Sequence, residues 1–233
     1  MRQVAWLRAI RYTDVMQSVA SWLEKCERFV VRNRFVFVSM LCVFAALSTL
    51  ELLSGRSPLG PDGCFGWWDG DIWSCENSQR VADAYSFSHI IHGMLFYGFL
   101  WLMARGAPLK RRFLFALLVE AAWELLENSP LIINRYRSAT IAQGYVGDSV
   151  LNSVCDVGMM AIGFGLARIS RLWLVVVLIV AMELGCLVWV RDNLTLNVLM
   201  LVHPVQSIKA WQSEGHCDGC PRPVGMRTRL GDG

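Results

Sequence analysis

Residues 172–190 have the sequence LWLVVVLIVAMELGCLVWV, which is apolar throughout except for Glu183. A second stretch, FVFVSMLCVFAALSTLELL at residues 35–53, is apolar until Glu51. A helix needs about 20 apolar residues to cross the hydrocarbon core of a bilayer. Both stretches therefore predict transmembrane helices.

The composition of the 233-residue chain agrees with this interpretation. Hydrophobic residues make up 55% and charged residues 18%, whereas a typical soluble domain is about 25% charged. These values exclude a disordered chain, a coiled coil and an ordinary cytosolic enzyme. The formal net charge of +3 is too small to indicate nucleic acid, so we expect the lipid bilayer as the main partner and no nucleic acid.

Three further segments are mostly apolar but carry acids or histidines: residues 87–104, 113–128 and 146–167. With the two clear spans they predict an all-α, polytopic bundle of about five transmembrane helices, forming one domain over residues 35–212. In residues 1–34, apolar residues recur every three or four positions with basic residues between them, as in an amphipathic helix. We expect this segment either at the lipid interface or packed on the bundle. Residues 213–233 are expected to be a disordered tail.

Basic residues set the predicted orientation. Thirteen of the 22 Lys and Arg residues lie in 1–34, 105–112 and 168–171, which a five-span arrangement places on one side of the membrane. The segments 54–86 and 129–145 hold two each. The N-terminus is therefore predicted to be cytoplasmic, and the two sparse segments are predicted to face outward.

Polar residues form stripes on three of the predicted spans. In the second span, His89 and His92 lie three residues apart on one face. Acids and an amide recur at i, i+4, i+7 in the third span and at i, i+4, i+8 in the fourth, each within about 80° of arc. These residues are Glu120, Glu124, Glu127, Asp148, Asn152 and Asp156. Gly158, Ala161 and Gly165 lie on the other side of the fourth span and are expected to allow close helix packing.

The predicted topology places these stripes at the outer ends of their helices. Charged groups within a span are costly, and they usually face the bundle interior and serve a function. We therefore expect one polar cavity that opens toward the periplasmic side and reaches partway into the bilayer. Glu51 is expected to snorkel to the interface, and Glu183 either joins the cavity or hydrogen-bonds a neighbour.

The chemistry of the cavity follows from its residue types. Imidazoles and carboxylates are suitable ligands for a divalent metal, and the candidate ligands are His89, His92, Glu124, Glu127 and Asp148. The candidate catalytic residues are Glu120, Glu124, Glu127, Asp148, Asn152 and Asp156, of which Asn152 and Asp156 would orient the others.

Two arginines follow the third span in the motif Arg135-Tyr-Arg137. They could pair with the nearby acids or bind a lipid phosphate, and they are the candidate substrate-binding residues. A metal-activated water beside such a phosphate clamp would indicate hydrolysis or group transfer on a lipid or envelope substrate.

Other functions stay open at this point. Chains of acids also serve transporters and proton relays, although no polar stripe continues to the cytoplasmic ends of these helices. The protein is alternatively a non-catalytic membrane scaffold, in which the polar groups only link helices through hydrogen bonds.

The cysteines and the C-terminal region add three further expectations. Cys64 and Cys75 share one outward loop, where an oxidising exterior would permit a disulfide. The tail contains His216-Cys-x-x-Cys220, a weak zinc signal because no second pair accompanies it. Residues 194–202 form an apolar run that is too short to span, which predicts a re-entrant or interfacial segment.

Several motifs carry a family resemblance. They are SHIIHG (88–93), EAAWELLENS (120–129), RYRSAT (135–140), GYVGDSVLNS (144–153) with Asp156, and RDNLT (191–195). This set resembles the uncharacterised protein family 0314, also called domain of unknown function 2585, over about residues 35–212. The resemblance implies a multi-span protein of the bacterial inner membrane. It implies no reaction, ligand or catalytic residue.

Overall fold

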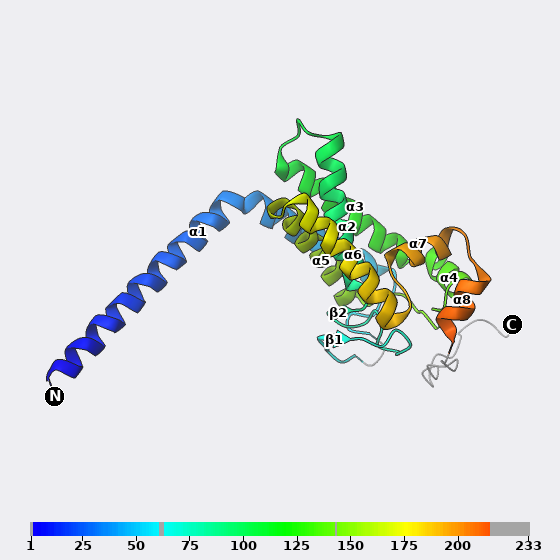
Figure 1. Cartoon of the computed structure of the whole chain (residues 1–233), viewed down its shortest axis with the longest axis horizontal. Helices are drawn as coiled ribbons and strands as arrows, with labels where there is room; N and C mark the ends of the chain where they lie inside the picture. Colours follow the sequence, from blue (N-terminus) through cyan, green and yellow to red (C-terminus); the bar gives the residue numbers. More distant parts are fainter. Residues whose placement is uncertain (1, 61–62, 143, 215–233) are drawn as a thin grey trace. The chain divides into compact units, whose positions relative to one another are not determined.

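The computed structural model describes residues 2–60, 63–142 and 144–214, which form an all-α fold (Figure 1). The helices are α1 (Arg2–Leu53), α2 (Ser86–Met103), α3 (Leu109–Glu127), α4 (Pro130–Ala139), α5 (Val150–Ile169), α6 (Leu172–Val190), α7 (Leu194–Val202) and α8 (Gln206–Ser213). Two short strands, β1 (Trp68–Asp69) and β2 (Ala82–Asp83), pair in parallel between α1 and α2. The predicted all-α class is confirmed.

The chain divides into two compact units, residues 1–42 and 43–233. The first unit is part of α1, because this helix runs from Arg2 to Leu53. The predicted amphipathic segment and the first predicted span therefore belong to one helix. Most side chains before Asn33 lie outside the described part of the structure, so the interfacial placement of residues 1–34 stays a prediction.

Four helical stretches are long and apolar enough to cross a membrane: Asn33–Leu53, Ser86–Met103, Val150–Ile169 and Leu172–Val190. They coincide with four of the five predicted spans. The remaining predicted span, 113–128, falls on α3, which carries three glutamates in its second half and three basic residues near its start. The bundle of about five long helices therefore agrees with the prediction, with α3 as its most polar member.

Helix boundaries follow from capping residues. Ser129, Ser149 and Asn193 each accept a hydrogen bond from the backbone N–H three residues later, at the starts of α4, α5 and α7. Such side chains satisfy N–H groups that the first helical turn leaves without a partner. The cap at Ser149 explains why α5 begins at Val150 and not at residue 146, where the apolar pattern starts.

The closest helix packing joins α2 and α5 through two glycines, Gly93 and Gly163. A methyl group at Gly93 would overlap the carbonyl oxygen of Met160, and one at Gly163 would overlap the carbonyl oxygen of Ile90. We call these four residues the glycine contact. Only residues without a side chain let two helix backbones approach this closely.

The expectation that Gly158 and Gly165 allow close packing is wrong. A methyl group at either position would have nothing within 4 Å. Small residues occur on several sides of α5, and Gly163 is the one that faces α2.

The outer surface of α6 is apolar. Leu172 is 80% exposed and Val188 is 84% exposed, and only Val175 and Cys186 of this helix are buried. Monomeric soluble proteins rarely expose apolar patches this extensive. The exposed face of α6 therefore supports the membrane interpretation that its length and composition suggest.

The long loop between α1 and α2 covers the start of α5. The carbonyl oxygens of Ser57, Pro58 and Ser78 accept hydrogen bonds from the N–H groups of Val150, Leu151 and Ser149, at 2.9 to 3.1 Å. The side chain of Gln79 also donates to the carbonyl oxygen of Gly147 at 2.9 Å. The loop is therefore tied to the same end of the bundle as the polar residues described next.

Candidate functional site

A cavity of about 280 Å³ lies among α2, α3 and the start of α5, with further walls from the α1–α2 loop, α4 and α7. Seven of the predicted site residues line it: His89, His92, Glu120, Glu127, Asp148, Asn152 and Asp156. Glu124, from the same stripe as Glu120, is buried beside it. The helical spacing on three separate spans therefore identified residues that the fold brings together.

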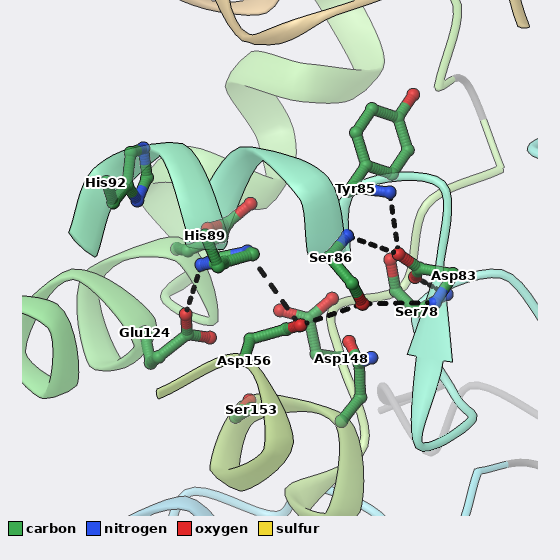
Figure 2. A network of polar contacts seen from close by, with 12 residues as sticks. Ser78, Asp83, Tyr85, Ser86, His89, His92, Glu124, Asp148, Ser153 and Asp156 are labelled. Carbon is green, nitrogen blue, oxygen red and sulfur yellow. Dashed lines mark hydrogen bonds and ion pairs between the residues drawn. The ribbon is translucent and has the colours of Figure 1, made fainter. Parts of the chain in front are cut away.

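His89 stands at the centre of this group. Its Nδ1 lies 2.7 Å from Oε1 of Glu120 and 3.4 Å from Oε1 of Glu124, and its Nε2 lies 3.8 Å from Oδ2 of Asp156. Figure 2 shows the imidazole between Glu124 and Asp156. Because α3 and α5 supply the carboxylates, this one side chain joins the polar stripes of three helices.

His92 approaches the same glutamate. Its Nδ1 lies 3.0 Å from Oε1 of Glu120, so both imidazoles share one carboxylate oxygen. The other oxygen of Glu120 forms no hydrogen bond within the described residues, and the side chain is fully buried. Oε1 of Glu124, a residue that is 1% exposed, also forms no hydrogen bond among the described residues, and its contact with the His89 imidazole at 3.4 Å is an ion pair only when that imidazole is protonated. A buried carboxylate oxygen in this state is costly unless a proton or a cation satisfies it.

Asp148 precedes α5 and is fixed on both carboxylate oxygens. The hydroxyl of Tyr145 donates to Oδ1 at 2.8 Å, and the amide of Asn128 donates to Oδ2 at 3.1 Å. Burial raises the pKa of Asp148 to about 6, while these two hydrogen bonds oppose the shift. Burial also raises the pKa of the Tyr145 hydroxyl well above its usual value, so this group stays a donor.

Asn128 ends α3 and links several buried groups. Its amide lies within hydrogen-bonding distance of Glu51 Oε1, at 3.3 Å, and of Ser153 Oγ, at 3.1 Å, while its oxygen accepts from the N–H of Asp148 at 2.6 Å. Glu51 is 1% exposed. The expectation that Glu51 snorkels to the interface is therefore wrong, because the side chain is held inside the bundle.

Glu127 reaches α4 and α7 through a tyrosine. The hydroxyl of Tyr136 lies 2.9 Å from Oε1 of Glu127 and 3.1 Å from Oδ1 of Asn197. Asn197 belongs to α7, the short apolar helix at residues 194–202. This helix therefore forms part of the cavity wall.

Asp156 and Asn152 connect α5 to the α1–α2 loop. Ser86 donates to Oδ1 of Asp156 at 3.1 Å, and the amide of Asn152 donates to the carbonyl oxygen of Arg80 at 3.0 Å. Asp83 accepts the N–H groups of Ser78, Tyr85 and Ser86, as Figure 2 shows. Burial raises the pKa of Asp83, and these backbone N–H groups oppose that shift.

Arg135 and Arg137 do not line the cavity. Nε of Arg135 donates to the carbonyl oxygen of Leu201 at 2.7 Å, and Nε of Arg137 donates to the carbonyl oxygen of Tyr145 at 2.6 Å. Both arginines thus hold backbone segments at the edge of the site. Their predicted contact with a substrate anion stays a prediction.

Glu183 does not join the cavity lining either. Its carboxylate accepts the N–H groups of Leu194 and Thr195, at 3.0 and 3.2 Å, and the hydroxyl of Thr195 at 2.5 Å. Of the two expectations for this residue, the contact with a neighbour is therefore the one that the structure confirms.

The cysteine expectations have mixed outcomes. Cys75 is disulfide-bonded but Cys64 is not its partner, so the predicted Cys64–Cys75 pairing is wrong. The His216-Cys-x-x-Cys220 motif and most of the predicted tail 213–233 lie outside the described residues.

Sequence reasoning missed several residues of the site. Tyr136 and Tyr145 contact the predicted acids but come from segments without a helical polar stripe, and Asn128, which ends the helix that carries Glu120, Glu124 and Glu127, was not counted with that stripe. Asp83 had a signal, since an Asp just before a helix often accepts backbone N–H groups of the first turn, as it does here from Tyr85 and Ser86. No comparable signal marks the two tyrosines.

Two groups of side chains in this site could hold a metal ion. The ligand atoms of His89, His92 and Glu120 lie within 4.8 Å of one another, and so do those of Glu124, Glu127 and Asp148. The first group offers nitrogen and oxygen, which suit transition metals, and the second offers oxygen only, which suits magnesium, calcium or manganese. Both donor sets fit a divalent cation.

The apolar helices and the buried polar cavity define a helical protein suited to a membrane, with a candidate metal centre between its helices. A family model described as "Protein of unknown function (DUF2585)" matches residues 51–214, which include all the predicted site residues. The chain belongs to this family, which confirms the resemblance seen in the motifs. No solved structure matches the chain.

Curated relatives carry the family name UPF0314 protein. One from Rhizobium etli is 49% identical over 78% of this chain and 94% of its own length. Others, from Sphingopyxis alaskensis and Rhizobium meliloti, are 52% and 42% identical over 73% and 86% of this chain and 91% and 94% of their own lengths. The similarity thus extends over nearly the full length of these relatives.

Proposed function

We propose that the protein is a multi-pass inner-membrane enzyme with a divalent metal in its polar cavity, acting as a hydrolase or transferase on a lipid or envelope substrate. The observation that most supports this proposal is the meeting of His89 and His92 on the buried carboxylate of Glu120, whose second oxygen forms no hydrogen bond within the described residues. Two imidazoles and a carboxylate form a common ligand set of catalytic metals.

The other cavity residues have distinct parts in this proposal. A bound metal would supply an activated water or polarise a substrate oxygen. Glu127 and Asp148 would accept or return the proton of the reaction. Asn152 and Asp156 would hold the surrounding elements in place, because both bind the segment 80–86.

The cavity wall supports an amphiphilic substrate. Besides the polar groups, it includes Val119 of α3 and Val198 of α7, which are 36% and 50% exposed. In a membrane, exposed apolar residues at the rim of a polar site would admit a lipid chain while the head group contacts the acids and imidazoles. Arg135 and Arg137 would contact the part of the substrate that projects from the cavity. The distribution of basic residues supports an opening toward the periplasm, with a cytoplasmic N-terminus.

The experiment is a metal measurement on the protein purified in detergent. We expect stoichiometric divalent metal in the wild type and its loss in the double variant His89→Ala/His92→Ala. The matched control is His203→Ala, an exposed histidine at the end of α7 that does not line the cavity. Metal contents are measured by inductively coupled plasma mass spectrometry, and elution profiles show whether each variant is folded.

Two results would contradict the proposal. A wild type without bound metal, even after incubation with zinc, manganese or magnesium, would remove the metal centre and leave the transporter or scaffold alternatives. Metal that persists in the double variant would place the centre elsewhere.

A further inference from the structure

The two candidate metal groups adjoin one another at His89. This residue belongs to the first group, His89, His92 and Glu120. Its Nδ1 lies 3.4 Å from Oε1 of Glu124, a member of the second group. Both groups contain residues that line the same cavity, and α3 contributes glutamates to both.

Each group contains a buried carboxylate oxygen that forms no hydrogen bond within the described residues. In the first group this atom is Oε2 of Glu120, and in the second it is Oε1 of Glu124. These two glutamates are 0% and 1% exposed. A buried carboxylate oxygen without a hydrogen bond is costly, and a bound cation would compensate it, so each group has its own reason to take up a cation.

The second group is also held in place as metal ligands usually are. Tyr136 binds the carboxylate of Glu127, while Tyr145 and Asn128 bind the two oxygens of Asp148. Hydrogen bonds of this kind orient ligands around a metal and leave each carboxylate oxygen a further lone pair. Donors from three different segments therefore fix an all-oxygen group beside the nitrogen-containing one.

We infer that the cavity binds two divalent cations per chain: one at His89, His92 and Glu120, and a second at Glu124, Glu127 and Asp148. This inference rests on the proposed function and deepens it: Glu127 and Asp148 act as metal ligands, and this role replaces the proton transfer assigned to them above. The two positions differ in chemistry, because the first offers imidazole and favours zinc, whereas the second offers carboxylates alone and favours magnesium or manganese. Two divalent metals held in one cavity are typical of enzymes that act on phosphoesters and other ester-like bonds.

The test counts Mn²⁺ ions bound to the metal-depleted protein, from the loss of the free Mn²⁺ signal in electron paramagnetic resonance. We expect two ions in the wild type and in the control His203→Ala. We expect one ion in Glu127→Gln, which removes a ligand of the second position only, and one in His89→Ala/His92→Ala. One equivalent of Zn²⁺ added first should leave a single Mn²⁺ position in the wild type and none in Glu127→Gln.

The wild type also gives a measurement that needs no variant. Two neighbouring Mn²⁺ ions are expected to show a spin-coupled signal that a single ion lacks. This signal keeps the inference testable even where a substitution disturbs folding.

The possible outcomes separate the inference from the proposed function. If the wild type binds only one Mn²⁺, there is a single metal centre and the second position is overturned. This conclusion holds whether that ion is lost in the histidine variant alone or in both variants. Two ions that are unaffected by Glu127→Gln would overturn the assignment of residues to it. A wild type that binds none would overturn both proposals.

Discussion

Helix α2 takes part in two different regions, the glycine contact with α5 and the polar cavity. At the glycine contact, Gly93 and Ile90 of α2 meet Met160 and Gly163 of α5 with backbone against backbone. At the cavity, His89 and His92 of the same helix face buried carboxylates of which two oxygens form no hydrogen bond within the described residues. In the first region there is no room for even one added methyl group. In the second, buried carboxylate oxygens are left without hydrogen bonds among the described residues. Tight backbone packing beside the cavity can therefore hold α2 in place, while the cavity retains buried polar groups that by themselves destabilise the fold.

The largest effect is expected where the glycine contact is broken. Gly163→Ala places a methyl group against the carbonyl oxygen of Ile90, so the two helices must move apart. Forcing extra volume into a packed interior costs about 1–3 kcal/mol and sometimes more, and a backbone atom cannot rotate away. We expect a marked fall in melting temperature and in the yield of folded protein, measured by thermal unfolding in detergent.

Gly165→Ala is the control for this prediction, because it lies two residues further along α5 with nothing within 4 Å of the added methyl group. Alanine favours a helix over glycine by up to about 1 kcal/mol, so this variant should be as stable as the wild type or more so. Equal melting temperatures for the two variants would show that the glycine contact does not hold the helices together.

A smaller effect is expected at a buried acid outside the cavity, Asp192. It accepts hydrogen bonds from Tyr85, Asn193 and Gln212, yet burial raises its pKa from 3.8 to about 6. The folded protein therefore binds more protons than the unfolded chain between these values, and stability falls as the pH rises through that window.

Asp192→Asn removes this ionisation and should change the pH profile of stability. We expect the melting temperature of the variant, relative to the wild type, to be higher at pH 7.5 than at pH 4.5. The exposed Asp71 on the α1–α2 loop provides the control, since Asp71→Asn should leave the difference between the two pH values unchanged. A constant offset between Asp192→Asn and the wild type would contradict the raised pKa.

The smallest effect on stability is expected inside the cavity. Tyr145→Phe removes one hydroxyl that donates to Asp148 and leaves the ring in place. A single hydrogen bond contributes about 1 kcal/mol net, so the melting temperature should fall far less than for Gly163→Ala. The affinity for Mn²⁺ should weaken as well, because Asp148 loses one of its orienting partners.

Tyr97→Phe is the matched control, because the Tyr97 ring packs on Phe164 outside the cavity lining. Its Mn²⁺ affinity should equal that of the wild type. If Tyr145→Phe destabilised the protein as strongly as Gly163→Ala, the cavity would contribute as much to stability as the glycine contact does, which would contradict this prediction.

The sequence predicted what depends on local pattern. Apolar length predicted the long helices, and the run at residues 194–202 coincides with α7. Helical spacing placed Glu120, Glu124 and Glu127 on one face, because the angle between positions on a helix is fixed. The meeting of this face with His89 followed from topology alone, since both were expected at the same membrane surface.

Contacts that depend on the rotation of one helix against another could not be predicted in this way. In the sequence alone, Gly158, Gly163 and Gly165 are equivalent small residues of one helix, and only the position of α2 distinguishes them. Tyr136 and Tyr145 likewise reach the acids because α4 and the following loop fold back over the cavity. Helix rotation and loop path are set by the packing of the whole bundle, which a single sequence does not display.

The contact of Glu183 with α7 has a consequence for how the protein is made. In a bilayer, an acid near the centre of a spanning helix costs about 2.5–3.5 kcal/mol on insertion. The N–H of Leu194 that satisfies Glu183 is 11 residues further along the chain and does not exist when α6 first emerges. The two helices should therefore leave the insertion machinery as a pair, so a chain cut after α6 would insert less efficiently than its hydropathy implies.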